Sequence, residues 1–295
     1  MGMLQDAREA SSDLFAEASS VLGYDLWDLV ENGPEGQLNQ TEYTQPALLT
    51  ASIALLRLAQ ARGLPSPDAV AGHSLGEYSA LVAAGVLQFA DAVMLVQKRG
   101  QFMQTAVPIG EGGMAAVLGL DDEQVREVCI AASQGEVVQA VNYNAPGQVV
   151  IAGNNAAIER AIKGCKEAGA KRAMALSVSA PFHSELMKPA AEELTGVLNE
   201  VNFAKPKIIV VQNVDAAVHD DPEEIRENLI KQMYGAVLWT DTVLMMKQIG
   251  VTTLIECGPG KVLTGLTKRI DKSITGHNVD SVASIATVSE ALIDG

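Results

Sequence analysis

Residues 68–76 read Asp68-Ala69-Val70-Ala71-Gly72-His73-Ser74-Leu75-Gly76, and this stretch decides the fold. A short apolar run leads into a helix that begins near Leu75, so we expect a strand, a sharp turn and a helix. The turn matches G-x-S-x-G, in which glycines leave room for the tight turn and the serine is forced outward. At the helix start, the amide of Leu75 can face a developing oxyanion. The pattern predicts Ser74 as a nucleophile; the alternative is a glycine-rich turn in which Ser74 only caps the helix.

A nucleophilic serine needs a base, and the chain has four histidines. His73 adjoins Ser74 in the turn, where a neighbouring side chain usually points elsewhere. His219 lies in a polar turn and His277 in a segment with weak signals, so we expect both to be solvated. His183 follows an apolar strand and precedes a helix, a position where α/β proteins gather catalytic groups. Elimination favours His183, although a histidine near a helix start is more often structural.

Strands and helices alternate along the chain, which predicts a mainly parallel sheet covered by helices. Between Gly112 and Ser179 the order changes to β-α-β-β-α-β, the ferredoxin-like arrangement, which we interpret as an inserted subdomain. The predicted domains are a core of residues 1–110 and 180–295 and an insertion of residues 111–179. The predicted helices are 7–22, 46–62, one from Leu75, 91–97, 121–133, 156–168, 184–198, 222–234, 240–249 and 260–270, and the predicted strands are 68–72, 113–120, 136–142, 148–152, 172–178, 207–214 and 252–257.

The composition excludes several classes of protein. The chain has 295 residues, 48% of them hydrophobic, which is ample for a globular core. Thirty-six acidic residues against 21 basic residues give a net charge of −15, so we expect no binding to nucleic acid or to anionic membranes. No uninterrupted apolar stretch is long enough to span a bilayer. Three scattered cysteines, Cys129, Cys165 and Cys257, fit buried positions in a reducing compartment, which favours the cytoplasm.

Five motifs are spread over the chain: Gly72-His73-Ser74-Leu75-Gly76-Glu77, Lys98-Arg99-Gly100, Asn144-Ala145-Pro146-Gly147-Gln148-Val149-Val150-Ile151-Ala152-Gly153, Pro181-Phe182-His183 and Gly258-Pro259-Gly260-Lys261-Val262-Leu263. Together they resemble the malonyl-CoA:acyl carrier protein transacylases and the acyltransferase domains of polyketide synthases. The resemblance spans nearly the whole chain. It implies an α/β-hydrolase-like core with a ferredoxin-like insertion, which agrees with the element order above.

The resemblance implies a role for each matching residue. Ser74 would attack a thioester, form an acyl-serine and pass the acyl group to the phosphopantetheine thiol of the carrier protein. His183 would act as base and then as acid, oriented by a backbone carbonyl at the position of Gln232. Arg99 would form a bidentate pair with the malonyl carboxylate, because its planar fork suits a carboxylate. Without the resemblance, Arg99 would be interpreted as an ordinary basic residue near the end of a helix.

The same resemblance implies the substrate and the partners. Phe182 matches the form in which an aromatic residue disfavours an α-methyl branch, which favours malonyl over methylmalonyl, and His73 is assigned with Arg99 and Phe182 to substrate binding. Malonyl-CoA is a substrate, so no cofactor and no metal are expected, and we predict a monomer. Carrier proteins of this kind are acidic and require a local basic face. The candidates for that face, which could equally be ordinary surface charges, are Lys171, Arg172, Lys188, Lys261, Lys268 and Arg269.

One departure from the family concerns the amino end. The family begins with an apolar strand that ends in a G-Q-G-S-Q motif, whose first glutamine supplies a second oxyanion N–H. This sequence starts at Met1-Gly2-Met3-Leu4, just beyond that motif. Loss of one oxyanion donor costs about 10² to 10³ in rate, so the chain as written is expected to be unstable or weakly active. Two alternatives therefore stay open: a serine hydrolase or thioesterase that uses the same residues, and a truncated non-catalytic remnant that binds the carrier.

Overall fold

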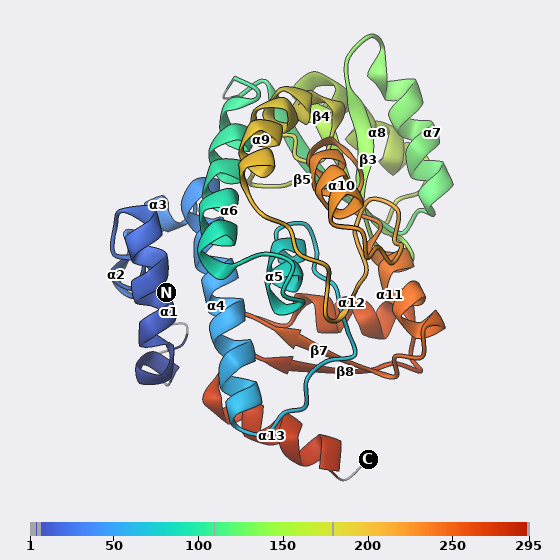
Figure 1. Ribbon diagram of the computed structural model, residues 1–295. Coiled ribbons are helices and arrows are strands. Elements are labelled where there is room, and N and C mark those ends of the chain that lie inside the picture. Colours follow the sequence, from blue (N-terminus) through green and yellow to red (C-terminus); the bar gives the residue numbers. More distant parts are fainter. Residues whose placement is uncertain (1–3, 5–6, 109, 179, 294–295) are drawn as a thin grey trace. The chain divides into compact units, whose positions relative to one another are not determined.

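The computed structural model describes Leu4 and residues 7–108, 110–178 and 180–293 (Figure 1). It is a mixed α/β structure with helices and small sheets, and it divides into two compact units that are described separately. One unit comprises Met1–Gly100, Asn202–Val210 and Met246–Gly295, and the other comprises Gln101–Val201 and Val211–Met245. The expectation for the amino end rests on Met1-Gly2-Met3, which lie outside the described residues.

The first unit begins with a group of helices. Helix α1 (Arg8–Leu22) buries Leu14 and Phe15 against α2 (Leu26–Asn32) and α4 (Thr41–Ala61), with α3 (Glu35–Leu38) between them in sequence. The helix predicted over 46–62 begins five residues earlier, so its predicted start at Pro46 was wrong. The carbonyl of Gln40 accepts hydrogen bonds from the N–H groups of Tyr43 and Thr44, so the first turn closes earlier in the chain and Pro46 lies inside the helix.

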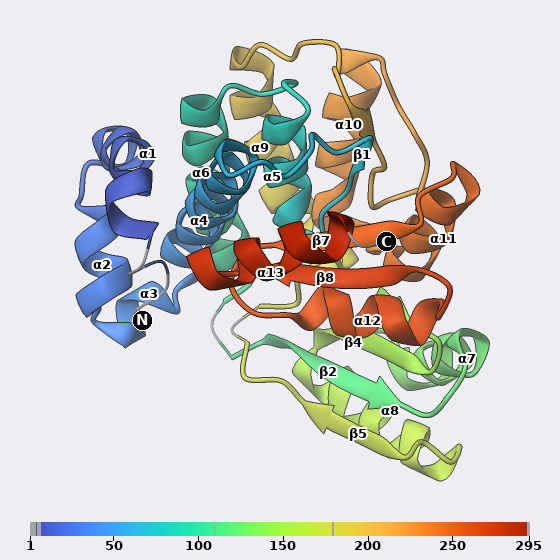
Figure 2. The ribbon, with the colours of Figure 1, turned by 90° about the horizontal axis from the view of Figure 1, so that it is seen from below.

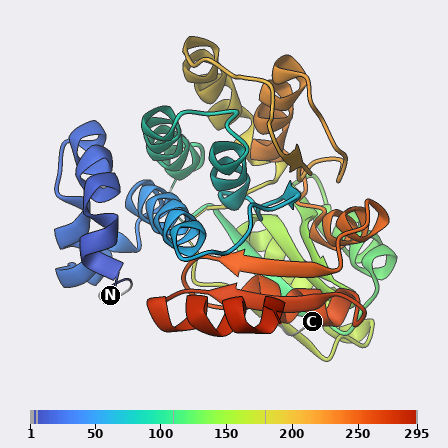
Figure 3. The ribbon, with the colours of Figure 1, turned by 60° about the horizontal axis from the view of Figure 1, so that its bottom comes forward.

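Two pairs of parallel strands complete the first unit. Strand β1 (Ala69–Val70) pairs with β6 (Ile209–Val210), and β7 (Thr253–Cys257) pairs with β8 (Thr275–Val279). Figures 2 and 3 show β7 and β8 side by side, with α13 (Val282–Ile293) along β8. The predicted strands 68–72 and 207–214 were too long, because only two residues of each find a partner strand. The last helices of this unit are α5 (Gly76–Ala83), the first part of α6 (Phe89–Thr105) and α12 (Val262–Ile270).

The second unit contains a four-stranded antiparallel sheet with strand order β3-β4-β2-β5. Its elements follow one another as strand, helix, strand, strand, helix and strand, which is the predicted order. Both helices pack on the sheet, and their shared core includes Val117, Val149, Ile151 and Ile158. The bounds are β2 (Gly112–Leu118), α7 (Asp122–Ser133), β3 (Val138–Ala145), β4 (Gln148–Asn154), α8 (Asn155–Glu167) and β5 (Arg172–Ala175).

The rest of the second unit is helical. A short 3₁₀ turn, η2 (Glu185–Met187), precedes α9 (Lys188–Glu200), where the sequence predicted one helix over 184–198. Helix α10 (Pro222–Tyr234) has the predicted bounds, because the Asp221 side chain caps it and Pro222 stands at its start. The first part of α11 (Trp239–Gln248) follows.

Candidate active site

Ser74 lies in a tight turn between β1 and α5. Its φ is +53°, in the left-handed region that L side chains rarely adopt. A side chain at Gly72 would place its Cβ 2.0 Å from the carbonyl carbon and oxygen of Gly76, so this glycine is required. At Gly76, however, a Cβ would meet nothing within 4 Å, and the expectation that both glycines serve the same steric purpose was wrong. The left-handed backbone conformation of Ser74 is strained, and the surrounding structure of the turn must maintain it.

The N–H of Leu75 directly follows the serine at the start of α5. The next three amides are used in the turn, since Gly76, Glu77 and Tyr78 donate to the carbonyls of residues 73, 74 and 75 at 2.9, 3.1 and 3.0 Å. Within the described part of the chain, Leu75 N–H donates to no other protein group. A backbone N–H at a helix start, beside a serine hydroxyl, is the kind of donor that binds a developing oxyanion.

Arg99 is buried beside the serine. It is 2% exposed, and its Nη2 donates a hydrogen bond to Ser74 Oγ at 3.1 Å. Its Nη1 donates to Gln45 Oε1 at 2.7 Å, and its guanidinium lies over the ring of Tyr78 at 5.5 Å from the centroid. Arg99 is therefore held by side chains from α4 and α5. The alternative of an ordinary basic residue near a helix end does not fit, because α6 continues to Thr105 and Arg99 is buried.

Burial and neighbouring side chains have opposite effects on the pKa of Arg99. Burial lowers the pKa of the guanidinium, and Tyr78 and Glu77 oppose that shift. Burial also raises the pKa of Tyr78 to about 12, so its ring contributes a neutral face to the cation. Gln45, Glu77 and Tyr78 are all buried, and the sequence prediction missed them. The sequence could have indicated Glu77 and Tyr78, because they directly follow the serine motif. Nothing in the sequence around Gln45 indicated that it belongs to the site.

His183 belongs to the second unit and is 4% exposed. It stands at φ +64°, and its Nδ1 lies 2.7 Å from the backbone oxygen of Gln232. Because a carbonyl oxygen only accepts, this contact assigns the proton to Nδ1 and leaves Nε2 as an acceptor. The carbonyl of Gln232 is available because it lies in the last turn of α10, where helical carbonyls lack an intrahelical partner.

Further side chains support the histidine. The Gln232 side chain is fully buried and donates from Nε2 to Asn213 Oδ1 at 3.5 Å. Ser184 Oγ donates to the carbonyl of Pro181 at 2.7 Å, which closes the turn that carries His183. Phe182 is partly buried against an apolar cluster that contains Met114 and Val150. Asn213 was missed by the sequence prediction.

The predicted site residues thus form two groups, one in each unit. The first unit holds His73, Ser74, Leu75 and Arg99, with His73 partly buried in the turn, and the second holds Phe182, His183 and Gln232. The basic residues proposed for partner binding are also divided. Lys171 and Arg172 are exposed at the start of β5, and Lys268 and Arg269 are exposed in the last turn of α12.

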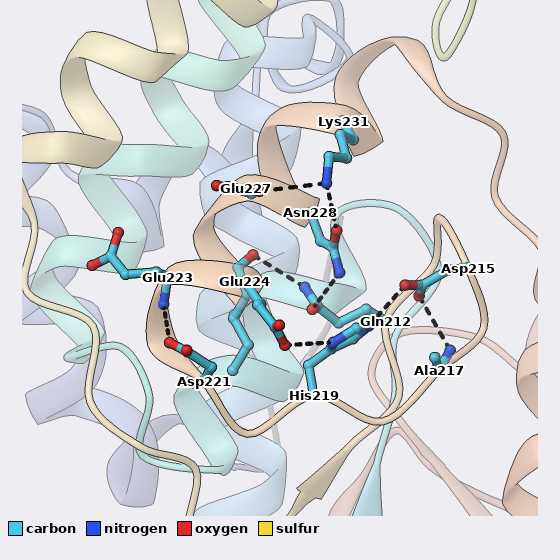
Figure 4. Close-up of polar contacts among 11 residues, drawn as sticks. Gln212, Asp215, Ala217, His219, Asp221, Glu223, Glu224, Glu227, Asn228 and Lys231 are labelled. Carbon is cyan, nitrogen blue, oxygen red and sulfur yellow. Dashed lines mark hydrogen bonds and ion pairs between the residues drawn. The ribbon is translucent and has the colours of Figure 1, made fainter.

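The expectation that His219 is solvated was wrong. Its side chain is 19% exposed, and its ring lies between two carboxylates (Figure 4). Nε2 is 2.7 Å from Asp215 Oδ2, and Nδ1 is 3.2 Å from Glu224 Oε2. Both carboxylates lie outside the polar segment 218–222 that predicted exposure, so the sequence around His219 did not indicate these contacts. His219 is held in an ion-pair network in the second unit.

The described residues contain no group of three or more histidine, cysteine or acidic side chains arranged to hold a metal ion. None of the helices in the described ranges combines the length and the apolar character that crossing a bilayer requires. The three cysteines are free thiols, and burial raises their pKa, to about 12 for Cys129, about 11 for Cys165 and about 12 for Cys257.

Residues 3–290 match the acyl transferase domain, and the chain therefore belongs to the acyl transferase domain family. It is 52% identical to the malonyl CoA-acyl carrier protein transacylase of Escherichia coli K12 over 293 residues, which cover 98% of this chain and 95% of that protein. Its fold matches an acyl carrier protein S-malonyltransferase from Vibrio cholerae at TM-score 0.96 and 56% identity, over 98% of this chain and 95% of the other. It also matches a malonyl-transacylase solved in complex with a type II polyketide acyl-carrier protein, at TM-score 0.97 and 51% identity, over 99% of this chain and 95% of that one.

Proposed function

We propose that this protein transfers the malonyl group from malonyl-CoA to the phosphopantetheine thiol of an acyl carrier protein in fatty acid biosynthesis. The observation that carries the proposal is the 3.1 Å contact between Arg99 Nη2 and Ser74 Oγ, which sets a buried cation beside a nucleophile. An acyl group with a terminal carboxylate could bind the cation through the carboxylate while the serine attacks its thioester. The names of the relatives agree, and one of them was solved with its carrier protein.

The proposed first half-reaction acylates the serine. Ser74 Oγ forms a bond to the thioester carbonyl carbon while its proton passes to His183 Nε2, and Leu75 N–H stabilises the oxyanion. The carbon–sulfur bond then breaks, and the thiolate of CoA takes the proton from His183. In the second half-reaction the phosphopantetheine thiol gives its proton to His183 and attacks the acyl-serine. The ester bond to Ser74 Oγ then breaks, the acyl group stays on the phosphopantetheine sulfur, and Ser74 Oγ takes the proton back from His183. The enzyme has returned to its starting state.

The orientation of His183 supports its role as a base. Its Nδ1 proton is held by the Gln232 carbonyl at 2.7 Å, so Nε2 can accept and return a proton without a third acidic residue. The carbonyl stabilises the imidazolium less than a carboxylate would. This suits a transferase, since His183 must give up the proton readily in each half-reaction.

Phe182 and the basic residues complete the proposal. Phe182 favours malonyl over methylmalonyl, although one methyl group in a pocket is worth only about 1 to 3 kcal/mol. Lys171, Arg172, Lys268 and Arg269 would receive an acidic carrier. A cytoplasmic location and a monomeric state stay predictions.

We also infer the finer fold class. The strand order β3-β4-β2-β5 with two helices supports a ferredoxin-like subdomain over residues 111–179, and the parallel strand pairs support an α/β-hydrolase-like core from residues 1–110 and 180–295.

Trapping the acyl-enzyme tests the proposed function. Incubation with malonyl-CoA and rapid quenching should yield a malonyl adduct that mass spectrometry locates on Ser74, and Ser74→Ala should abolish it. A folded wild-type protein without an adduct would support the carrier-binding remnant.

Arg99→Ala distinguishes the transferase from a thioesterase. In a transacylase the variant should lose its preference for malonyl-CoA over acetyl-CoA, because the carboxylate partner is gone. A general thioesterase should hydrolyse both thioesters with little change.

A further inference from the structure

The contact between Arg99 and Ser74 has a chemical consequence for the hydroxyl itself. Nη2 donates to Ser74 Oγ at 3.1 Å from a guanidinium that is 2% exposed. A hydroxyl oxygen that accepts from a cation commits a lone pair and loses electron density, so it is a weaker nucleophile. Burial strengthens this effect, since water does not screen the cation. Ser74 is thus restrained by the residue proposed to bind its substrate.

Gln45 fixes the orientation of the same guanidinium. Its Oε1 accepts from Arg99 Nη1 at 2.7 Å, and Gln45 is buried on α4 at 6% exposure. The Tyr78 ring lies against the guanidinium at 5.5 Å. Because Nη1 is held by the amide and one face by the ring, Nη2 is directed towards Ser74. A carboxylate that reached Nη2 would compete with Ser74 Oγ for the same donor.

We propose that Arg99 restrains Ser74 until the carboxylate of the acyl group takes over Nη2, with Gln45 as the positioning residue for this exchange. The inference rests on the proposed function and deepens it. A carboxylate ion is a stronger acceptor than a neutral hydroxyl, so the exchange favours release of Oγ. Selection for malonyl then acts on the rate of acylation as well as on affinity, because an acyl group without a carboxylate meets a restrained nucleophile.

Acylation by a neutral ester in the presence of formate tests the exchange. With p-nitrophenyl acetate, Ser74 Oγ bonds to the acetyl carbon, the ester bond breaks and p-nitrophenolate leaves, while the serine proton passes to the base. Formate should accelerate this burst about tenfold in the wild type, the lower limit for loss of a hydrogen bond from a charged donor. Chloride at equal ionic strength should not. Arg99→Ala should react fast without formate and should not respond to it.

Gln45→Met tests the positioning role, because methionine keeps the length of the side chain and removes the acceptor. The formate response should fall at least about threefold, and acylation by malonyl-CoA should fall more than acylation by acetyl-CoA. Gln45→Glu retains an oxygen acceptor and should retain the response. Gln60→Met is the matched control, since Gln60 lies exposed on the same helix. A purely structural role of Gln45 would slow both thioesters equally.

The outcomes separate the exchange from the proposed function. If malonyl-CoA labels Ser74 normally and formate leaves the p-nitrophenolate burst unchanged or slows it, the exchange is refuted and the transferase stands. If a folded Gln45→Met variant keeps the full formate response, Gln45 is not the positioning residue. Absence of any malonyl label on Ser74 refutes the transferase itself and the exchange with it.

Discussion

At the scale of single residues, His183 depends on a backbone atom of Gln232, whereas the Gln232 side chain serves packing. Gln232→Ala keeps the carbonyl 2.7 Å from Nδ1 and removes the donor to Asn213. We therefore expect acylation by malonyl-CoA to stay within about tenfold of wild type. The free energy of unfolding should fall by about 1 to 3 kcal/mol, because a buried amide is lost.

His183→Ala is the comparison variant, and it should lower the acylation rate about 10² to 10⁴-fold. Quench-flow experiments measure the acylation rate of both variants, and urea unfolding measures their stability. If a folded Gln232→Ala variant lost as much acylation rate as His183→Ala, the prediction would be contradicted.

His219 provides a pH-dependent contribution to stability at the same scale (Figure 4). Burial lowers its pKa, but Asp215 and Glu224 together outweigh burial, so the native pKa is raised. A raised native pKa means that the stabilisation is fully present below the unfolded value of about 6.5 and is lost as pH rises through the native pKa.

We therefore expect the difference in unfolding free energy between wild type and His219→Gln to be largest near pH 5.5 and to shrink towards pH 8.5, as urea titrations across that range would show. Asp215→Asn removes the closer carboxylate and should reduce the pH dependence. A difference that is constant with pH would contradict the ion-pair interpretation.

At the scale of elements, the two glycines of the serine turn differ sharply. Gly72→Ala forces a Cβ into the backbone of Gly76 at 2.0 Å, where no side chain can yield, so we expect a protein that folds poorly or does not acylate. Gly76→Ala adds a methyl group where nothing lies within 4 Å, at the first position of α5, and should leave stability unchanged or raise it by up to about 1 kcal/mol. Thermal unfolding of both variants compares them directly, and a Gly72→Ala variant as stable as Gly76→Ala would show that the turn is wider at Gly72 than the structure indicates.

The elements that the sequence predicted well are those whose ends carry local chemistry. Asp121 and Gln124 form a capping box on α7, and Asp221 with Pro222 begins α10, so both starts were readable from adjacent residues. Strands β1 and β6 were overestimated, because pairing depends on residues far away in the sequence. The candidate site likewise could be predicted where adjacent residues mark it and not where a contact joins distant residues. Ser74 stood in a local motif, whereas Gln45 reaches Arg99 across 54 positions of sequence, and no local signal marks such a contact.

At the scale of the whole molecule, net charge and local charge make opposite predictions for an acidic carrier. The total of −15 repels it, whereas the exposed residues Lys171, Arg172, Lys268 and Arg269 would attract it. Association with a carrier should therefore be governed by where the positive charges lie. Total charge alone would make all exposed basic residues equivalent.

A pair of double charge reversals separates these effects. Arg172→Glu with Arg269→Glu changes the net charge by −4, from −15 to −19, and Arg62→Glu with Lys163→Glu, also at exposed positions, changes it by the same amount. We expect the first variant to raise the KM for the acyl carrier protein at least about tenfold at low salt, with the effect reduced in about 0.5 M salt, and to leave acylation by malonyl-CoA near wild type. The control variant should change the KM little. Steady-state kinetics at both salt concentrations measure the KM, and equal effects of the two variants would assign the change to net charge and would contradict a specific role of Arg172 and Arg269 in carrier binding.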